Sequence, residues 1–407
     1  MPIKTYLLIF LFELGFGIKL NIVGEISISE LFLLAYTPFI IAKIQWQRAK
    51  ELKTVTVAYL LLLATQIFSE ALVSNGLSSS LKGLAITVVS YLHFIFLFYN
   101  LTKDKHVILV VILSQIAMKL LFGTSFEEQS TEDILAGEAA TYLKFYIAPL
   151  TILIFLAISV IYKNRNFPIL FSLLGIVFIL LGARSSGGMS LFAGMIAYLM
   201  AHKNLIPNKS VLLISIVVLL IVSYGFYVYY VNLVLSGEIT SGNNSQLFIC
   251  KNPYNPIELL MAGRSEVWVG WQAFMDKFWF GAWPYDTTGH YQRLMFMMHG
   301  DTLSPDTLSY HFLIPSHSVL IGSGMMNGVF AFSAILYIIF YFLKKGFMSM
   351  EFCEQKYLLV LAYYILNLLW NALFSPQSHF RQTLPIAFAI ILILYLSNIQ
   401  KKKIHFN

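Results

Sequence analysis

Long hydrophobic runs alternate with short polar segments along almost the whole chain. A transmembrane helix needs about 20 mostly apolar residues, and fewer where it is partly shielded. By this criterion the pattern predicts about twelve spans. They lie near residues 5–20, 28–45, 54–73, 81–101, 105–122, 142–161, 167–183, 187–201, 210–235, 317–343, 356–374 and 383–399. We therefore expect an all-α, polytopic membrane protein with a single membrane domain over residues 1–407.

One polar interruption, residues 236–316, is far longer than the others. Inside it, residues 258–280 carry Trp268, Trp271, Met275 and Trp279 at helical spacings of three and four. This pattern predicts a helix with an aromatic face that lies at the membrane surface or packs across the mouths of the transmembrane helices. Such a face is as compatible with a simple interfacial anchor as with a binding surface.

The positive charges sort the connecting segments into two sides. Cytoplasmic loops are enriched in Lys and Arg. One alternate set of segments carries Lys4; Lys43, Arg48, Lys50 and Lys53; Lys103 and Lys105; Lys163 and Arg165; Lys203 and Lys209; Lys344, Lys345 and Lys356; and Lys401 to Lys403. The other set is poor in Lys and richer in acid. The alternation predicts cytoplasmic termini and an external 236–316 loop, out of reach of ATP and nucleotide sugars.

Composition supports the membrane assignment and argues against other classes. The chain is 58% hydrophobic and 12% charged, whereas soluble domains are about a quarter charged. Its net charge of +7 sits in short loops and not on a basic face with interleaved aromatics, so we expect no nucleic-acid partner. Cys250 and Cys353 fall on opposite predicted sides, which excludes a disulfide between them. The loop histidines lack zinc-site spacing, so we expect no metal and no cofactor.

Three arginines reach the same predicted external face. Arg184 follows an apolar run and Arg264 opens the aromatic helix. The planar guanidinium suits phosphate oxygens, so the two could bind a lipid-linked phosphate or pyrophosphate. A single arginine in such a place more often anchors to headgroups or to a local carboxylate. Arg381 is either a third anion contact or a snorkelling residue at a helix end.

His317 stands where the long loop re-enters the membrane. Histidine can accept a proton from a sugar hydroxyl near neutral pH, although a lone interfacial histidine is more often structural. Polar and aromatic loop residues could bind a glycan, but they are common in any solvated loop. The substrate-binding candidates, besides Arg381, are Glu266, Trp268, Tyr285, Asp286 and Arg293.

Ionisable residues inside hydrophobic runs favour a different class of protein. Glu13, Glu70 and His93 lie in or near predicted spans, and such residues often mark proton or ion pathways. They support a transporter or lipid flippase as the competing hypothesis. Against it, two matching halves with broken helices are not evident, and the unusual residues concentrate in one external loop.

The combination resembles the O-antigen polymerase and O-antigen ligase superfamily of bacterial inner-membrane glycosyltransferases. His317 and Ser318, followed after nine residues by Gly328, look like the ligase pattern, with Ala331 in place of its last glycine. Ala262-Gly263-Arg264, a helix, and then Phe280-Gly281 are similar to the family's Gly-Arg segment. Arg184 and Arg381 also occupy family-like places. The Arg-x10-Gly repeats of some polymerases are missing, because Met195 and Met275 stand at those positions.

The resemblance implies a GT-C-like helical fold and an inverting, metal-independent transfer at the periplasmic face. It implies an undecaprenyl-pyrophosphate-linked glycan as donor, a second glycan as acceptor, and a chain-length regulator as a further partner beside the bilayer. By this analogy His317 is the base that deprotonates the acceptor, and Arg184 and Arg264 bind the pyrophosphate. A polymerase of repeat units is the first expectation, and a ligase to lipid A-core is the second.

Overall fold

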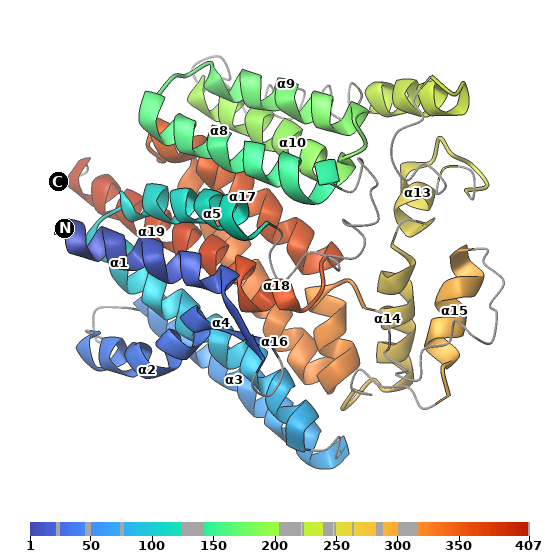
Figure 1. The fold of residues 1–407 in the computed structure, drawn as a ribbon, viewed down its shortest axis with the longest axis horizontal. Helices are drawn as coiled ribbons and strands as arrows, with labels where there is room; N and C mark the ends of the chain where they lie inside the picture. The colour runs from blue at the N-terminus through green and yellow to red at the C-terminus, as the bar shows by residue number, and fades with distance from the viewer. Residues whose placement is uncertain are drawn as a thin grey trace. The chain divides into compact units, whose positions relative to one another are not determined.

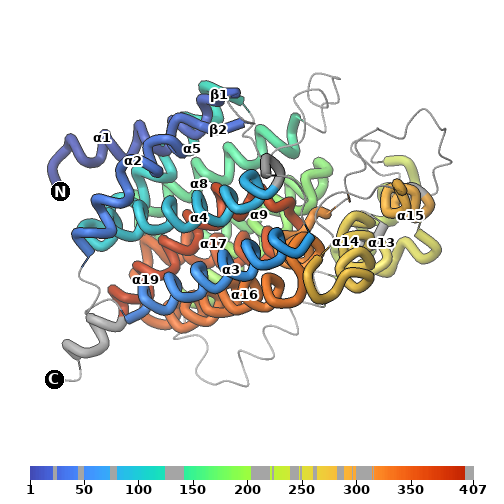
Figure 2. Tube along the Cα trace, turned by 90° about the horizontal axis from the view of Figure 1, so that it is seen from below, coloured from blue at the N-terminus to red at the C-terminus, as the bar shows by residue number. Residues whose placement is uncertain are grey.

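The structure is a computed structural model that is almost entirely helical (Figures 1 and 2). It describes residues 1–21, 25–44, 50–73, 77–123, 142–202, 221, 224–238, 247, 250–262, 264–281, 288–299, 314 and 316–405. Within these ranges the only strands are β1 (Lys19–Asn21) and β2 (Glu25–Ser27), which pair antiparallel.

The chain divides into two compact units. The first unit comprises Met1–Glu127, Ser265–Phe352 and Asn367–Asn407, and the second comprises Glu128–Arg264 and Cys353–Leu366. The division falls inside helix α17 (Gln355–Phe374).

The first unit is a bundle around α4 and α16. Its helices are α1 (Ile3–Leu14), α2 (Ile28–Lys43), α3 (Lys50–Val73), α4 (Leu77–Lys103), α5 (Val107–Phe122), α14 (Ser265–Asp276), α15 (His290–His299), α16 (Val319–Met350), α18 (Ser378–Arg381) and α19 (Thr383–His405). Helix α4 packs against α2, α3 and α19, and α16 packs against α3, α14 and α19. Segments far apart in the sequence thus build one core.

The second unit contains a tightly packed helical hairpin. Its elements are η3 (Leu143–Ile147), α8 (Ala148–Tyr162), α9 (Phe167–Leu180), α10 (Arg184–Ala201), α13 (Pro256–Ala262) and the helical residues 224–235. At Gly175 an added Cβ would lie 2.6 Å from the Gly187 carbonyl oxygen, and at Gly194 it would lie 2.5 Å from that of Pro168. Small residues therefore let the α9 and α10 backbones approach closely.

In the part of the chain that the structure describes, five helices are long and apolar enough to cross a membrane: Lys50–Val73, Ser80–Lys103, Leu143–Tyr162, Val319–Met350 and Gln355–Phe374. Three shorter apolar helices are Val107–Phe122, Phe167–Leu180 and Thr383–Asn398. The membrane class is therefore supported, and the count of about twelve spans stays a prediction. Half of the predicted span 210–235 falls outside the described residues.

The first predicted span, residues 5–20, is wrong at its end. Helix α1 stops at Leu14, and Gly15–Gly17 form a 3-10 turn that leads into β1. Glycine weakens a helix, and here it also makes room, because a Cβ on Gly17 would lie 2.3 Å from the Phe122 ring. The hydrophobic run continues past this turn, so hydropathy alone did not reveal where the helix ends.

The predicted surface helix over 258–280 is two helices. Helix α13 ends at Ala262 and α14 begins at Ser265, with Arg264 in a turn between them. The two helices belong to different units. The aromatic spacing was thus correct for α14, but it gave no sign of the interruption before it.

Helix α16 is broken at Gly328. This residue has φ 79° and ψ −173°, a region that is essentially restricted to glycine. A Cβ there would lie 2.1 Å from the Trp279 carbonyl oxygen, and one on Gly281 would lie 2.3 Å from that of Met326. The amide of Val329 donates a 2.8 Å hydrogen bond to the Phe278 carbonyl. The segment after α14 therefore crosses α16 at the break, backbone against backbone.

Polar contacts sort the helix ends of the first unit into two groups. In one group Tyr6 donates to Asp104, and Lys345 Nζ lies 3.6 Å from Glu51 Oε1. In the other group Ser69 donates to the Phe280 carbonyl, and Arg381 pairs with Glu30. Charge alternation predicts that the loops next to the first group are cytoplasmic and that those next to the second group are external.

Asp104 holds the turn between α4 and α5 against α1. Burial raises the pKa of its carboxyl, but hydrogen bonds from the Tyr6 hydroxyl and from the backbone and ring of His106 outweigh burial and lower the pKa to about 2. The carboxylate therefore stays ionised at neutral pH.

Replacing Gly328 tests the break in α16. Gly328→Ala forces a side chain into a glycine-only conformation and against Trp279, so we expect the free energy of unfolding to fall by about 1–3 kcal/mol or more. The measurement is reversible unfolding of the purified protein in detergent. Gly188→Ala is the control, because a Cβ there meets nothing within 4 Å; equal stability of the two variants would contradict the described crossing.

Candidate functional site

His317 and Glu266 meet where two helices of the first unit begin. Glu266 is the second residue of α14. His317 precedes Ser318, the N-cap of α16, whose buried hydroxyl accepts from the Ile321 amide at 3.1 Å and donates to the Ala372 carbonyl at 3.1 Å. The cap therefore fixes the backbone next to the histidine.

The two side chains are close but not ideally aligned. His317 Nδ1 lies 3.4 Å from Glu266 Oε1, with the side chains 27% and 20% exposed. The distance suits an ion pair, whereas Nδ1 has no hydrogen-bond partner of good geometry among the described residues. Catalytic contacts are often longer before substrate binds. A carboxylate on Nδ1 leaves Nε2 as the nitrogen that can accept a proton from a substrate.

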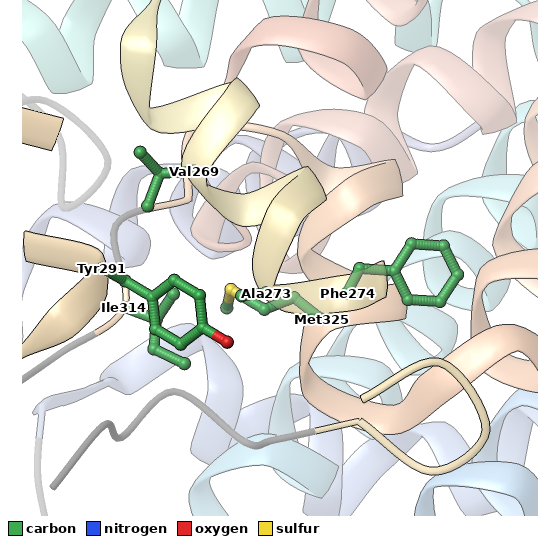
Figure 3. Close-up of a cluster of buried hydrophobic side chains, with 6 residues drawn as sticks. All are labelled: Val269, Ala273, Phe274, Tyr291, Ile314 and Met325. Carbon is green, nitrogen blue, oxygen red and sulfur yellow. The ribbon is translucent and has the colours of Figure 1, made fainter. Parts of the chain in front are cut away.

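The packing of α14 on α16 holds this pair together. Figure 3 shows buried Val269, Ala273 and Phe274 of α14 beside Met325 of α16, and Tyr291 and Ile314 join the same cluster. The close approach depends on small residues, since a Cβ on Gly324 would lie 3.0 Å from the Phe274 ring. The Tyr291 hydroxyl donates to Asp276 at 2.8 Å, which ties α15 to the end of α14.

The first turn of α16 also meets the segment between α17 and α18. Gln377 Nε2 donates to the Val319 carbonyl at 2.7 Å. A Cβ on Gly322 would lie 2.8 Å from both Gln377 Nε2 and Ser316 Oγ. Ser316 Oγ is buried without a hydrogen-bond partner among the described residues. The neighbourhood of His317 is thus polar and closely packed.

One face of α14 remains exposed. Trp268 is 43% exposed and Trp271 is 39% exposed, and Trp279 beyond the helix is 61% exposed. The opposite face is buried in the cluster of Figure 3. Tryptophan commonly lies at membrane interfaces, where one part of the ring system is apolar and another hydrogen-bonds.

Arg381 has a buried partner that the sequence did not suggest. Its guanidinium forms a bidentate ion pair with Glu30, which is fully buried, and also donates to the Glu25 carbonyl at 3.2 Å. Glu30 in turn accepts from the Ser27 amide at 2.8 Å as part of a capping box. Arg381 therefore joins α18 to the start of α2. This contact favours a structural role over the substrate contact we expected.

The remaining predicted residues are distributed differently. Arg184 begins α10 in the second unit, and its guanidinium carbon lies 5.5 Å from the centroid of the Tyr230 ring. Arg264 is half-buried in the turn before α14. Arg293 is exposed and donates to the Thr288 carbonyl at 2.7 Å. Tyr285 and Asp286 lie outside the described residues.

A further polar row was missed along α17. Asn371 Nδ2 donates to Asn367 Oδ1 at 2.9 Å, and Ser375 Oγ donates to Asn371 Oδ1 at 2.8 Å. All three side chains are buried. Their spacing of four residues was a visible signal, as was the Ser27-x-x-Glu30 pattern of the capping box. Across the described ranges, no group of three or more His, Cys, Asp or Glu side chains could hold a metal ion.

The sequence matches no protein-family model, and no curated protein matches it significantly. Functional assignment therefore depends on the described residues and on the resemblance given above.

The Glu30–Arg381 pair can be tested by removing one charge or both. Arg381→Gln leaves Glu30 buried and unpaired, so we expect a loss of about 3–5 kcal/mol in the free energy of unfolding. Glu30→Gln combined with Arg381→Gln should recover most of that loss.

Lys19→Gln is the control, since Lys19 lies 3.5 Å from Glu25 in an exposed pair and should cost less than about 1 kcal/mol. An Arg381→Gln protein with unchanged stability and impaired substrate binding would contradict the structural role.

Proposed function

We propose that the protein is a glycosyltransferase that joins lipid-linked oligosaccharide repeat units at the periplasmic face of the bacterial inner membrane. The observation that carries this proposal is the 3.4 Å approach of His317 Nδ1 to Glu266 Oε1. The two segments that meet there are those that carry the resemblance to the polymerase and ligase superfamily. Gly281 and Gly328 are two further positions of that resemblance. They meet where the chain after α14 crosses α16, and a side chain on either would clash with the backbone of the other segment.

The chemistry needs one base and one stabilised leaving group. His317 Nε2 accepts the proton of an acceptor sugar hydroxyl, and the oxygen attacks the anomeric carbon of the donor glycan. The bond from that carbon to the undecaprenyl-pyrophosphate oxygen breaks, and the pyrophosphate leaves with the electron pair. A single displacement inverts the anomeric centre. Glu266 orients the imidazole and stabilises its protonated form.

The resemblance adds Arg184 and Arg264 as residues that bind the pyrophosphate and stabilise its departure. Arg264 stands two residues before Glu266 in the chain. We assign substrate contact also to the exposed face of Trp268 and Trp271, because aromatic rings stack on sugar rings and lie well among lipid headgroups. Arg381 is left out of this set because Glu30 already neutralises it.

A ligase that transfers finished glycan to lipid A-core is the second candidate, since the His317-Ser318 pattern is shared with ligases. Deletion of the gene separates the two. Loss of a polymerase leaves single-repeat lipopolysaccharide, whereas loss of a ligase leaves long polymer on its lipid carrier.

Substitutions of the pair test the assignment of the base. We expect His317→Ala to abolish chain growth in cells that still export repeat units, and Glu266→Gln to reduce the transfer rate at least about tenfold.

Glu266→Asp should restore part of the rate, because the charge is kept. Lys277→Gln, an exposed change just beyond α14, is the matched control. Normal polymer length in His317→Ala, or an unchanged transfer rate in Glu266→Gln, would contradict the proposed roles.

A further inference from the structure

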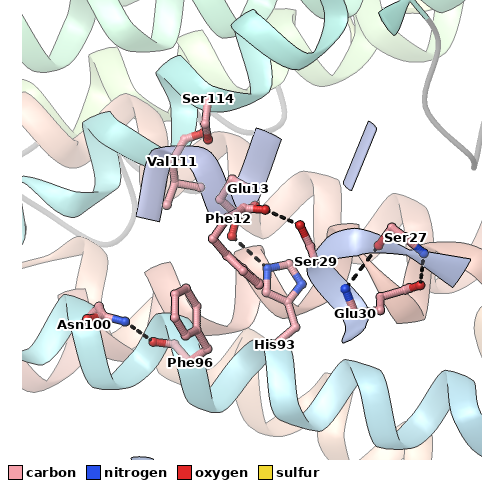
Figure 4. A network of polar contacts seen from close by, with 10 residues as sticks. All are labelled: Phe12, Glu13, Ser27, Ser29, Glu30, His93, Phe96, Asn100, Val111 and Ser114. Carbon is pink, nitrogen blue, oxygen red and sulfur yellow. Dashed lines mark hydrogen bonds and ion pairs between the residues drawn. The ribbon is translucent and has the colours of Figure 1, made fainter. Parts of the chain in front are cut away.

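A second acid–histidine pair lies inside the first unit, and the proposed transfer does not use it. Glu13 of α1 and His93 of α4 meet with Oε1 and Nε2 at 2.9 Å (Figure 4). Their side chains are 2% and 0% exposed. The other ring nitrogen, His93 Nδ1, is buried and has no hydrogen-bond partner among the described residues.

The two residues come from different parts of their helices. Glu13 lies in the last turn of α1, and His93 lies in the interior of α4, ten residues before its end at Lys103.

The immediate surroundings are aromatic. The His93 ring centroid lies 4.7 Å from that of Phe16 and 5.7 Å from that of Phe12. Figure 4 also shows the Ser29 hydroxyl close to the pair, and this hydroxyl donates to the Phe12 carbonyl. In this low-dielectric setting a net charge on the pair is costly.

Charged groups on the packed elements do not neutralise the pair in any described contact. Glu30 of α2 is paired with Arg381 of α18, and Lys119 of α5 is buried. The remaining titratable groups on α2, α3, α4, α18 and α19 are Tyr36, Lys43, Lys50, Glu51, Lys53, Tyr59, Glu70, Lys82, Tyr91, Tyr99, Lys103, His379 and Tyr395, with Lys401 to Lys403 and His405 at the end of α19. Tyr59 is bonded to Ser90, Ser80 donates to Glu70, and Glu51 and Tyr395 both contact Lys345.

We propose that Glu13 and His93 form a proton-binding site buried in the first unit that holds one proton at neutral pH, so that the pair carries no net charge. The proton is shared, either as carboxylate with imidazolium or as carboxylic acid with neutral imidazole. Ionisable groups buried among apolar helices often mark proton pathways. The site is independent of the His317 cluster, so its test and the test of glycosyl transfer have separate outcomes.

Nuclear magnetic resonance can count the proton directly. The full-length protein is labelled with 13C at glutamate carboxyls and 15N at histidine rings, placed in lipid nanodiscs at pH 7, and assigned with Glu13→Gln and His93→Gln. We expect the wild-type signals to show exactly one of imidazolium or carboxylic acid at this pair. In His93→Gln the Glu13 carboxyl should become protonated, and in Glu13→Gln the His93 ring should be neutral.

Glu25→Gln, which removes an exposed carboxylate on β2, is the control and should change neither signal. A wild-type pair of carboxylate and neutral imidazole would overturn the proposal. Because that result comes from the unaltered protein, it holds even if a variant fails to fold.

Discussion

The crossing at Gly281 and Gly328 is the constraint on which the candidate site depends. It lets the chain after α14 pass backbone to backbone over α16, and the α16 break leaves a short helix between Ser318 and Asn327. With α14 packed against that short helix, the beginnings of both helices lie side by side. His317 and Glu266 are therefore neighbours because two glycines allow a contact that no side chain would permit.

Burial in an apolar phase explains the polar contacts of the first unit. Glu30 is fully buried and is paired with Arg381, and Glu13 is buried against His93. A charge in such surroundings is costly unless it has a partner or is neutralised by a proton. The His317–Glu266 pair differs, because both side chains keep partial exposure. Partial exposure is what a group that exchanges protons with a substrate needs.

Hydropathy predicted the long helices well, because their signal is local. It placed α3, α4, α16 and α17 within a few residues at most ends and seven at the end of α16. It failed where the backbone turns: α1 ends before Gly15, and α16 breaks at Gly328. Hydropathy carries no information on contacts between distant residues, such as Glu30 and Arg381, which are 351 positions apart. His317 and Glu266 were each candidates, but only three-dimensional packing pairs them.

The most direct test of the central claim uses the purified protein in liposomes with the lipid-linked repeat unit as sole substrate. If His317 and Glu266 act in glycosyl transfer, longer glycans on the lipid carrier will accumulate without nucleotide, metal or ion gradient, and His317→Ala will form none. Ion-dependent uptake of solute without any new glycosidic bond would contradict the account and favour a transporter.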